Sequence, residues 1–159
     1  MTDVYRLPRV RIDAEVHLSG RQVRKVSLFL GDRAETRPGP ERPSDLLNSS
    51  ADFIPALERD AVVLINLENV LRVTVDAEHE IGIDDISMLD VSLAQATRQR
   101  VHVMLEDGTT TRGDLSYVLP EGQRRIQDYL NAKERFFPLY DGGLVHLIRK
   151  SRVVLVTPH

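Results

Sequence analysis

The sequence predicts a mainly β protein that contains an internal duplication of two small antiparallel five-stranded barrels with short helical turns. The first observation is the repeat itself. Residues 42–75 align without a gap to residues 125–158, and twelve of the 34 aligned positions are identical. Average residue usage would give about two or three identities by chance. The second observation is that apolar and polar residues alternate along several other stretches, which is typical of half-buried strands.

The repeat divides the chain into three parts. We expect a first small-barrel repeat at residues 1–75, a connector at residues 76–99 and a second small-barrel repeat at residues 100–159. A unit of roughly 60 residues buries little of its own surface, so the repeats should pack against each other. We expect a near two-fold axis to relate them. The connector is acidic and apolar. The spacing of its acidic residues matches no calcium loop. Its apolar residues are dense and favour burial, so we expect it to pack between the repeats.

Each repeat is expected to contain a β-hairpin, a loop with a helical turn, and then three short strands. In the first repeat Ser19-Gly20 supplies the hairpin turn, and in the second Asp107-Gly108 does so with a preferred pair of turn residues. The hairpin strands of the first repeat are predicted at residues 9–18 and 23–30, and those of the second at 101–105 and 113–119. The later strands are predicted at residues 53–55, 62–65 and 70–75, and at 136–139, 144–148 and 153–156.

Two polar residues of the predicted helical turn occur in both repeats. Asp45 and Asp128 stand at its start, where a carboxylate accepts hydrogen bonds from free backbone N–H groups. Asn48 and Asn131 stand at its end, where asparagine tolerates a left-handed backbone. Because turn chemistry requires such side chains wherever the unit recurs, we interpret all four as structural turn residues rather than as a binding site.

Composition excludes several kinds of chemistry. The 159 residues include no cysteine, which excludes disulfides, thiolate catalysis and cysteine-ligated zinc. The net charge of −3 argues against general nucleic-acid binding, which is usually accompanied by a basic excess. The N-terminal residues have no apolar core of signal-peptide length, and no apolar run approaches the length of a membrane span. We therefore expect a cytoplasmic protein with no membrane partner.

Candidate catalytic residues do not emerge from the sequence. Nucleophile elbows, Walker loops and glycine-rich dinucleotide turns are absent. The five histidines are scattered, and none is spaced from another as metal ligands would be: His17, His79, His102, His146 and His159. His17 and His102 lie on the polar side of their predicted strands, so we expect them at the solvated surface. We predict no enzyme, and no catalytic, cofactor-binding or metal-binding residues.

Two motifs of the second repeat resemble those of the Sm-like proteins, which share small SH3-like barrels. Val103-x-Leu105-x-Asp107-Gly108, followed by Gly113-x-Leu115, resembles their first motif, and Leu147-Ile148-Arg149-Lys150-x-x-Val153 resembles their second. The resemblance implies tandem SH3-like or Sm-like barrels. The patterns Asp45-x-Leu47-Asn48 and Phe53-x-Pro55 also resemble a bacterial family, but that resemblance implies no function.

The predicted function is that of a non-catalytic protein-interaction or scaffold module, because small barrels present strand edges and loops to partners. A protein partner or a homo-oligomer is expected. The alternative is an RNA- or nucleic-acid-binding protein. One tight turn reads Asn66-Leu67-Glu68-Asn69 in the first repeat and Arg149-Lys150-Ser151-Arg152 in the second. Arg149, Lys150 and Arg152 are therefore the candidate contacts for phosphate or an acidic partner, as the Sm-like resemblance implies for this turn.

Overall fold

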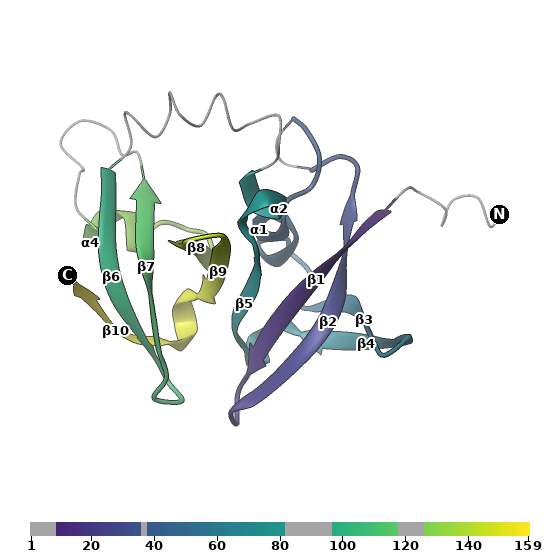
Figure 1. Cartoon of the computed structure of the whole chain (residues 1–159), viewed down its shortest axis with the longest axis horizontal. Coiled ribbons are helices and arrows are strands. Elements are labelled where there is room, and N and C mark those ends of the chain that lie inside the picture. The colour runs from purple at the N-terminus through teal and green to yellow at the C-terminus, as the bar shows by residue number, and fades with distance from the viewer. Residues whose placement is uncertain (1–8, 36–37, 82–96, 118–125) are drawn as a thin grey trace.

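In the part of the chain that the structure describes, ten antiparallel strands form one sheet, and short helical turns connect several of them (Figure 1). The structure, a computed structural model, describes residues 9–35, 38–81, 97–117 and 126–159. The strand order across the sheet is β10-β6-β7-β8-β9-β5-β1-β2-β3-β4. The prediction of a mainly β fold with short helical turns is thus confirmed.

The elements fall into two halves with the same sequence of strands. The strands of the first half are β1 (Arg9–Leu18), β2 (Gln22–Gly31), β3 (Phe53–Glu58), β4 (Ala61–Asn66) and β5 (Val70–Asp76). Those of the second half are β6 (Thr97–Leu105), β7 (Thr110–Tyr117), β8 (Phe136–Asp141), β9 (Leu144–Arg149) and β10 (Val153–Pro158). The helical turns are α1 (Pro43–Leu47), η2 (Leu67–Asn69), α2 (Ala77–Ile81), α4 (Ile126–Leu130) and η3 (Lys150–Arg152). No helix in these described stretches is long and apolar enough to cross a membrane.

The repeat in the sequence is also a repeat in the structure. The bounds of α1, β3, β4 and η2 reappear 83 residues later as those of α4, β8, β9 and η3. The order β5-β1-β2-β3-β4 in one half corresponds to β10-β6-β7-β8-β9 in the other. The two halves also share a break in strand register. The pairing of β1 with β5 shifts at the repeat position where the pairing of β6 with β10 shifts. Equivalent residues therefore occupy equivalent strands.

The hairpins form where the sequence predicts them, although β7 begins at Thr110 and the predicted residues 118 and 119 lie outside the described part of the chain. Ile12, Ala14 and Val16 alternate along β1 and are buried, so one face of this strand belongs to the core. The turn between β1 and β2 passes through positive φ at Gly20, and Gly108 does the same between β6 and β7. Glycine suits these positions because it has no Cβ to clash in a left-handed backbone.

The two halves join edge to edge, and this junction differs from the predicted two-fold relation. Figure 1 shows the second half on the left and the first half on the right, with β9 and β5 between them. A two-fold axis would pair equivalent strands with each other. Here β5 pairs with β9, the counterpart of β4. The prediction of a near two-fold axis is therefore wrong, and the relation is head to tail. The sheet formed by the described strands does not close, since β10 and β4 are its terminal strands.

Each half surrounds its own hydrophobic core, but the two cores exchange side chains across the junction. The core of the first half includes Phe136, Val145 and Leu147, which belong to β8 and β9 of the second half. The core of the second half includes Leu71, which belongs to β5 of the first. Apolar burial contributes roughly 25 cal/mol per Å². The exchanged residues thus give the junction an apolar interior of its own.

Most of the predicted connector, residues 82–96, lies outside the described residues. Its described beginning forms α2, a single helical turn directly after β5. This turn contacts β5, β9 and α1. Glu80 on α2 is buried, and its carboxylate accepts hydrogen bonds from the backbone N–H and the hydroxyl of Ser44 at the start of α1. Burial raises the pKa of Glu80, and the bonds from Ser44 oppose that rise.

Candidate interaction surface

The internal junction is a short antiparallel ladder between β5 and β9. Five residue pairs face each other, among them Val73 with Leu147 and Val75 with Val145. All four of these residues are buried. A polar contact lies between these two apolar pairs, because the Thr74 hydroxyl is 2.7 Å from Nδ1 of His146. The ladder therefore combines backbone pairing with a buried apolar layer, which is how permanent interfaces are built.

Arg149 lies at the end of β9 and is one of the three cations predicted to contact phosphate or an acidic partner. Its side chain is buried, and Nη1 donates to the backbone carbonyl of Leu67 at 3.0 Å. Nη2 donates to the Glu68 carboxylate at 3.2 Å, and the guanidinium lies 5.5 Å from the ring centroid of Phe136. Burial lowers the pKa of Arg149, and Glu68 opposes this shift. The guanidinium of Arg149 thus binds η2 of the first half to β9 of the second half.

The other two cations of the basic turn also bind protein groups. Arg152 donates to the Glu68 carbonyl through Nε at 3.0 Å and to the Glu106 carboxylate through Nη1 at 3.0 Å. Lys150 donates to the carbonyl of Ala132 at 2.7 Å, within its own half. Arg149 and Arg152 together clamp η2, so the basic residues of the second copy serve the junction between the halves.

Asn48 is a second link across the junction. Its side-chain amide accepts a hydrogen bond from the N–H of Phe136 at 2.8 Å and donates one to the carbonyl of the same residue at 3.2 Å. Next to it, the Arg135 guanidinium donates to the carbonyl of Leu47 at 3.2 Å and to that of Ser49. Asn48 therefore has a partner in the other half, in addition to its position at the end of α1.

The remaining predicted turn residues lie at or near helical turns. Asp45 accepts a hydrogen bond from the N–H of Arg42 at 2.8 Å, which satisfies a free donor at the start of α1. Asp128 lies in the first turn of α4. Asn131 follows the end of α4, where its N–H donates to the carbonyl of Gln127 at 3.0 Å, and its side chain is exposed. The structure thus brings Asn48, Arg149 and Arg152 together at the junction, and leaves Asn131 away from it.

Among the described strands β4 pairs only with β3, and its other edge exposes apolar residues whose counterparts are buried at the internal junction. Val62 and Leu64 on β4 are 67% and 69% exposed. Their counterparts in the repeat, Val145 and Leu147 on β9, are fully buried against β5 and the first core. The same repeat position is therefore solvent-facing at the end of the sheet and part of the core in its middle.

The same contrast holds at β3 and at the opposite edge of the sheet. Phe53 at the start of β3 is 56% exposed, whereas its counterpart Phe136 is 1% exposed. Val154 on β10 is also 56% exposed, whereas its counterpart Leu71 is fully buried in the second core. Apolar residues of types that proteins usually bury are thus exposed at both terminal edges, and also on the interior hairpin β1–β2 at Val10 and Val23.

An open hollow of about 270 Å³ lies beside the free edge of β4. It is lined mainly by apolar residues of β1 and β4, among them Val16, Leu18 and Ile65. The strand pairing makes Val16 the counterpart of Val103 and Leu18 the counterpart of Leu105. In the second half, Val103, Leu105 and Ile148, which is the counterpart of Ile65, form a core together with Leu71. The hollow in the first half thus corresponds to the site in the second half where Leu71 packs.

A polar cluster lies beside the junction and includes two histidines that sequence reasoning treated as unrelated. Nε2 of His17 is 2.7 Å from the Glu15 carboxylate and 3.1 Å from Nη2 of Arg72, whose Nη1 donates to the Thr111 hydroxyl at 2.6 Å. Burial and the nearby Arg72 lower the pKa of both His17 and His146. The expectation that His17 is a solvated surface residue is wrong, because Arg72 approaches it from β5.

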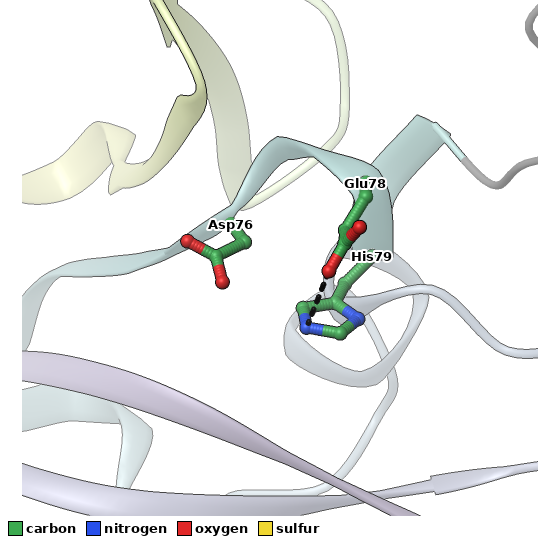
Figure 2. A group of neighbouring side chains, drawn as sticks. All are labelled: Asp76, Glu78 and His79. Carbon is green, nitrogen blue, oxygen red and sulfur yellow. Dashed lines mark ion pairs between the residues drawn. The ribbon is translucent and has the colours of Figure 1, made fainter.

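Three residues at the end of β5 and the start of α2 bring potential metal ligands together. Figure 2 shows Asp76, Glu78 and His79, with an ion pair of 3.9 Å between Glu78 and His79. One ligand atom from each lies within 4.8 Å of the others. Asp76 and Glu78 are both exposed, and exposed carboxylates gather easily in water. We assign no metal to this group.

Sequence reasoning missed the free edges and the exchange of core residues. One signal was present in β5, where Val70 and Leu71 are adjacent apolar residues followed by Val73 and Val75. A strand with apolar residues in both phases is typical of a central strand with two covered faces. No protein family model, no curated protein and no solved structure matches this chain in the comparisons.

Proposed function

We propose that this protein is a non-catalytic interaction or scaffold module, built from two duplicated small barrels whose edge strands β4 and β10 receive protein partners. The order β5-β1-β2-β3-β4 and its repeat in the second half favour small SH3-like or Sm-like barrels that open where they meet a neighbour. Edge strands carry unpaired backbone groups and pair readily with another strand.

One observation carries the proposal. Val62 and Leu64 are about two-thirds exposed on β4, while their counterparts Val145 and Leu147 are buried where β9 meets β5. The equivalent strand β9, with the same apolar positions, thus packs against β5 within the chain, which supports a similar contact at β4. A solvent-facing role would favour charged residues or a bulge at such an edge.

The charged groups of the second copy support the same function. Arg149 and Arg152 donate to backbone carbonyls of η2, and Arg152 also binds the Glu106 carboxylate. These are contacts between protein groups, made by the residues that would otherwise contact phosphate. The net charge of −3 also favours a protein partner over nucleic acid.

A capture experiment tests the proposal. The immobilised full chain is exposed to lysate, and bound material is identified by mass spectrometry and by a nuclease-sensitive stain. Val62→Lys with Leu64→Lys disables the β4 edge, whereas Val10→Lys with Val23→Lys is a matched control on exposed positions of the interior hairpin β1–β2. We expect a bound protein that the edge variant loses and the control retains. Bound RNA that depends on Arg149, Lys150 and Arg152, with no edge-dependent protein, would refute the proposal.

A further inference from the structure

We infer that copies of this chain associate head to tail, with β10 of one molecule pairing antiparallel to β4 of the next in the register of the internal β5–β9 junction. This inference rests on the proposed interaction function and names its partner as a second copy of the chain. The internal junction already joins one repeat to the other through strands equivalent to β10 and β4. An interface between non-equivalent surfaces leaves both surfaces available again at the ends of the pair.

The register follows from the repeat. At the internal junction Val73 pairs with Leu147 and Thr74 pairs with His146. The corresponding pairs between molecules are Val156 with Leu64 and Thr157 with Val63. Pro158 replaces Val75, and a proline has no N–H to donate, so one potential ladder bond is absent. The intermolecular ladder is therefore expected to be shorter than the internal one.

Apolar side chains would fill the same places that they fill at the internal junction. Leu71 extends from β5 into the core of the second half, and its counterpart Val154 is exposed on β10. The hollow beside β4 is lined by Val16, Leu18 and Ile65, which are counterparts of the residues around Leu71. Val154 of one molecule thus has a matching apolar recess on the next. Burial of such surface is the main driving force for association.

A polar contact repeats in the same way. Across the internal junction the amide of Asn48 bonds both backbone groups of Phe136. The counterparts are Asn131, which is exposed, and Phe53, which is 56% exposed and whose backbone receives no side-chain bond from the described residues. Head-to-tail contact brings these two together. The same contact would then form once within the chain and once between molecules. This explains why both repeats contain the asparagine and the phenylalanine.

The internal junction and the proposed junction between molecules differ in charge, and this difference predicts how the association responds to salt. Arg149 and Arg152 bind η2 at the internal junction, whereas the corresponding residues of the first half are Asn66 at the end of β4 and Asn69 in η2. No charged residue lies on β4 or β10. We therefore expect an apolar contact that depends on protein concentration and changes little with salt, since screening acts on charges.

Complementary edge variants test the inference with the full chain. Val62→Lys/Leu64→Lys blocks β4, and Val154→Lys/Leu155→Lys blocks β10, while Val10→Lys/Val23→Lys serves as the control. Light scattering after size exclusion should give the wild type and the control masses above 18.0 kDa that rise with concentration. Each blocked variant alone should remain a monomer. Their mixture should form a complex of twice the monomer mass and nothing larger, because each contributes one intact edge.

Cysteine cross-linking tests the register. The chain has no cysteine, so any disulfide joins introduced residues. Val63 and Thr157 are the counterparts of His146 and Thr74, and each is replaced by cysteine. At the internal junction the Thr74 hydroxyl and Nδ1 of His146 are 2.7 Å apart. Mixing these two single variants under mild oxidation should yield a cross-linked dimer. Val63→Cys mixed with Leu155→Cys is the shifted control, since diagonal positions are about 7–8 Å apart, beyond normal disulfide reach.

The outcomes separate this inference from the proposed function. A monomeric wild type at every concentration, or no complex in the mixture of blocked variants, would overturn the head-to-tail inference. If the β4-blocked variant then still lost a captured protein, the interaction function would stand with a different partner. Self-association by either blocked variant alone would indicate a two-fold contact between equivalent edges and would equally overturn the inference. Circular dichroism confirms that all variants are folded.

Discussion

Replacing Arg149 with alanine should destabilise the folded chain substantially, although the residue belongs to a turn that the sequence presents as basic surface. The bond from its guanidinium to the Leu67 carbonyl is buried, and a hydrogen bond that involves a charged group contributes about 1.5–3 kcal/mol. The ion pair with Glu68 adds under about 1 kcal/mol, because the glutamate side chain is largely exposed. The contact over Phe136 adds about 0.5–1 kcal/mol. We expect a loss near 3 kcal/mol.

Urea unfolding at low protein concentration, followed by circular dichroism, measures this loss. Lys150→Ala is the matched control, because Lys150 is partly exposed and makes one bond within its own half, so about 0.5–1 kcal/mol is expected. Glu68→Gln isolates the ion pair and should cost less than about 1 kcal/mol. If Arg149→Ala lowered the free energy of unfolding by no more than Lys150→Ala does, the assignment of Arg149 to the junction would be refuted.

Three further predictions concern the junction and its surroundings. Leu71→Ala should cost about 2–5 kcal/mol in urea unfolding, because Leu71 is fully buried in the second core; a cost below about 1 kcal/mol would contradict that placement. Asn48→Ala should cost about 1–3 kcal/mol by the same assay, because it leaves both backbone groups of Phe136 without that partner, whereas Asn131→Ala should leave the stability of the monomer within about 0.5 kcal/mol of the parent. For Glu80, burial raises the pKa above its ordinary value of 4.5, so the folded state holds the proton more tightly than the unfolded state. Stability should then fall as pH rises from that value through the raised pKa. Glu80→Gln should make this decline shallower, and an unchanged pH profile would contradict the assignment.

Local structure was predictable from the sequence where it depends on local pattern. The alternation of Ile12, Ala14 and Val16 predicts a strand with one buried face, and that strand is β1. The gap-free repeat predicts equivalent elements, and the bounds of β4 and β9 differ by the repeat length. These features follow from side-chain direction along an extended chain, which a single sequence displays directly.

The junction was not predictable in the same way, because strand pairing joins residues far apart in the chain. Nothing local to Thr74 or His146 states that they face each other, and the pattern of β5 fits any central strand. Arg149 was misleading for a related reason. A cation in a turn suggests solvent, but here the buried carbonyl of Leu67 and the ring of Phe136 come from distant parts of the chain. His17 illustrates the same point, since Arg72 covers it from another strand.

The covalent link between the two repeats has a consequence for any larger structure that they build. The connection within one chain gives the β5–β9 contact a high effective concentration, so it forms whether the protein is dilute or abundant. In a head-to-tail series, tethered contacts would alternate with untethered ones, and five-stranded units would be added and removed only in pairs. Odd numbers of units would be unreachable. A substitution at Arg149 would change every second contact and leave the intervening ones as they were, so the two kinds of contact could be tuned separately within one sequence.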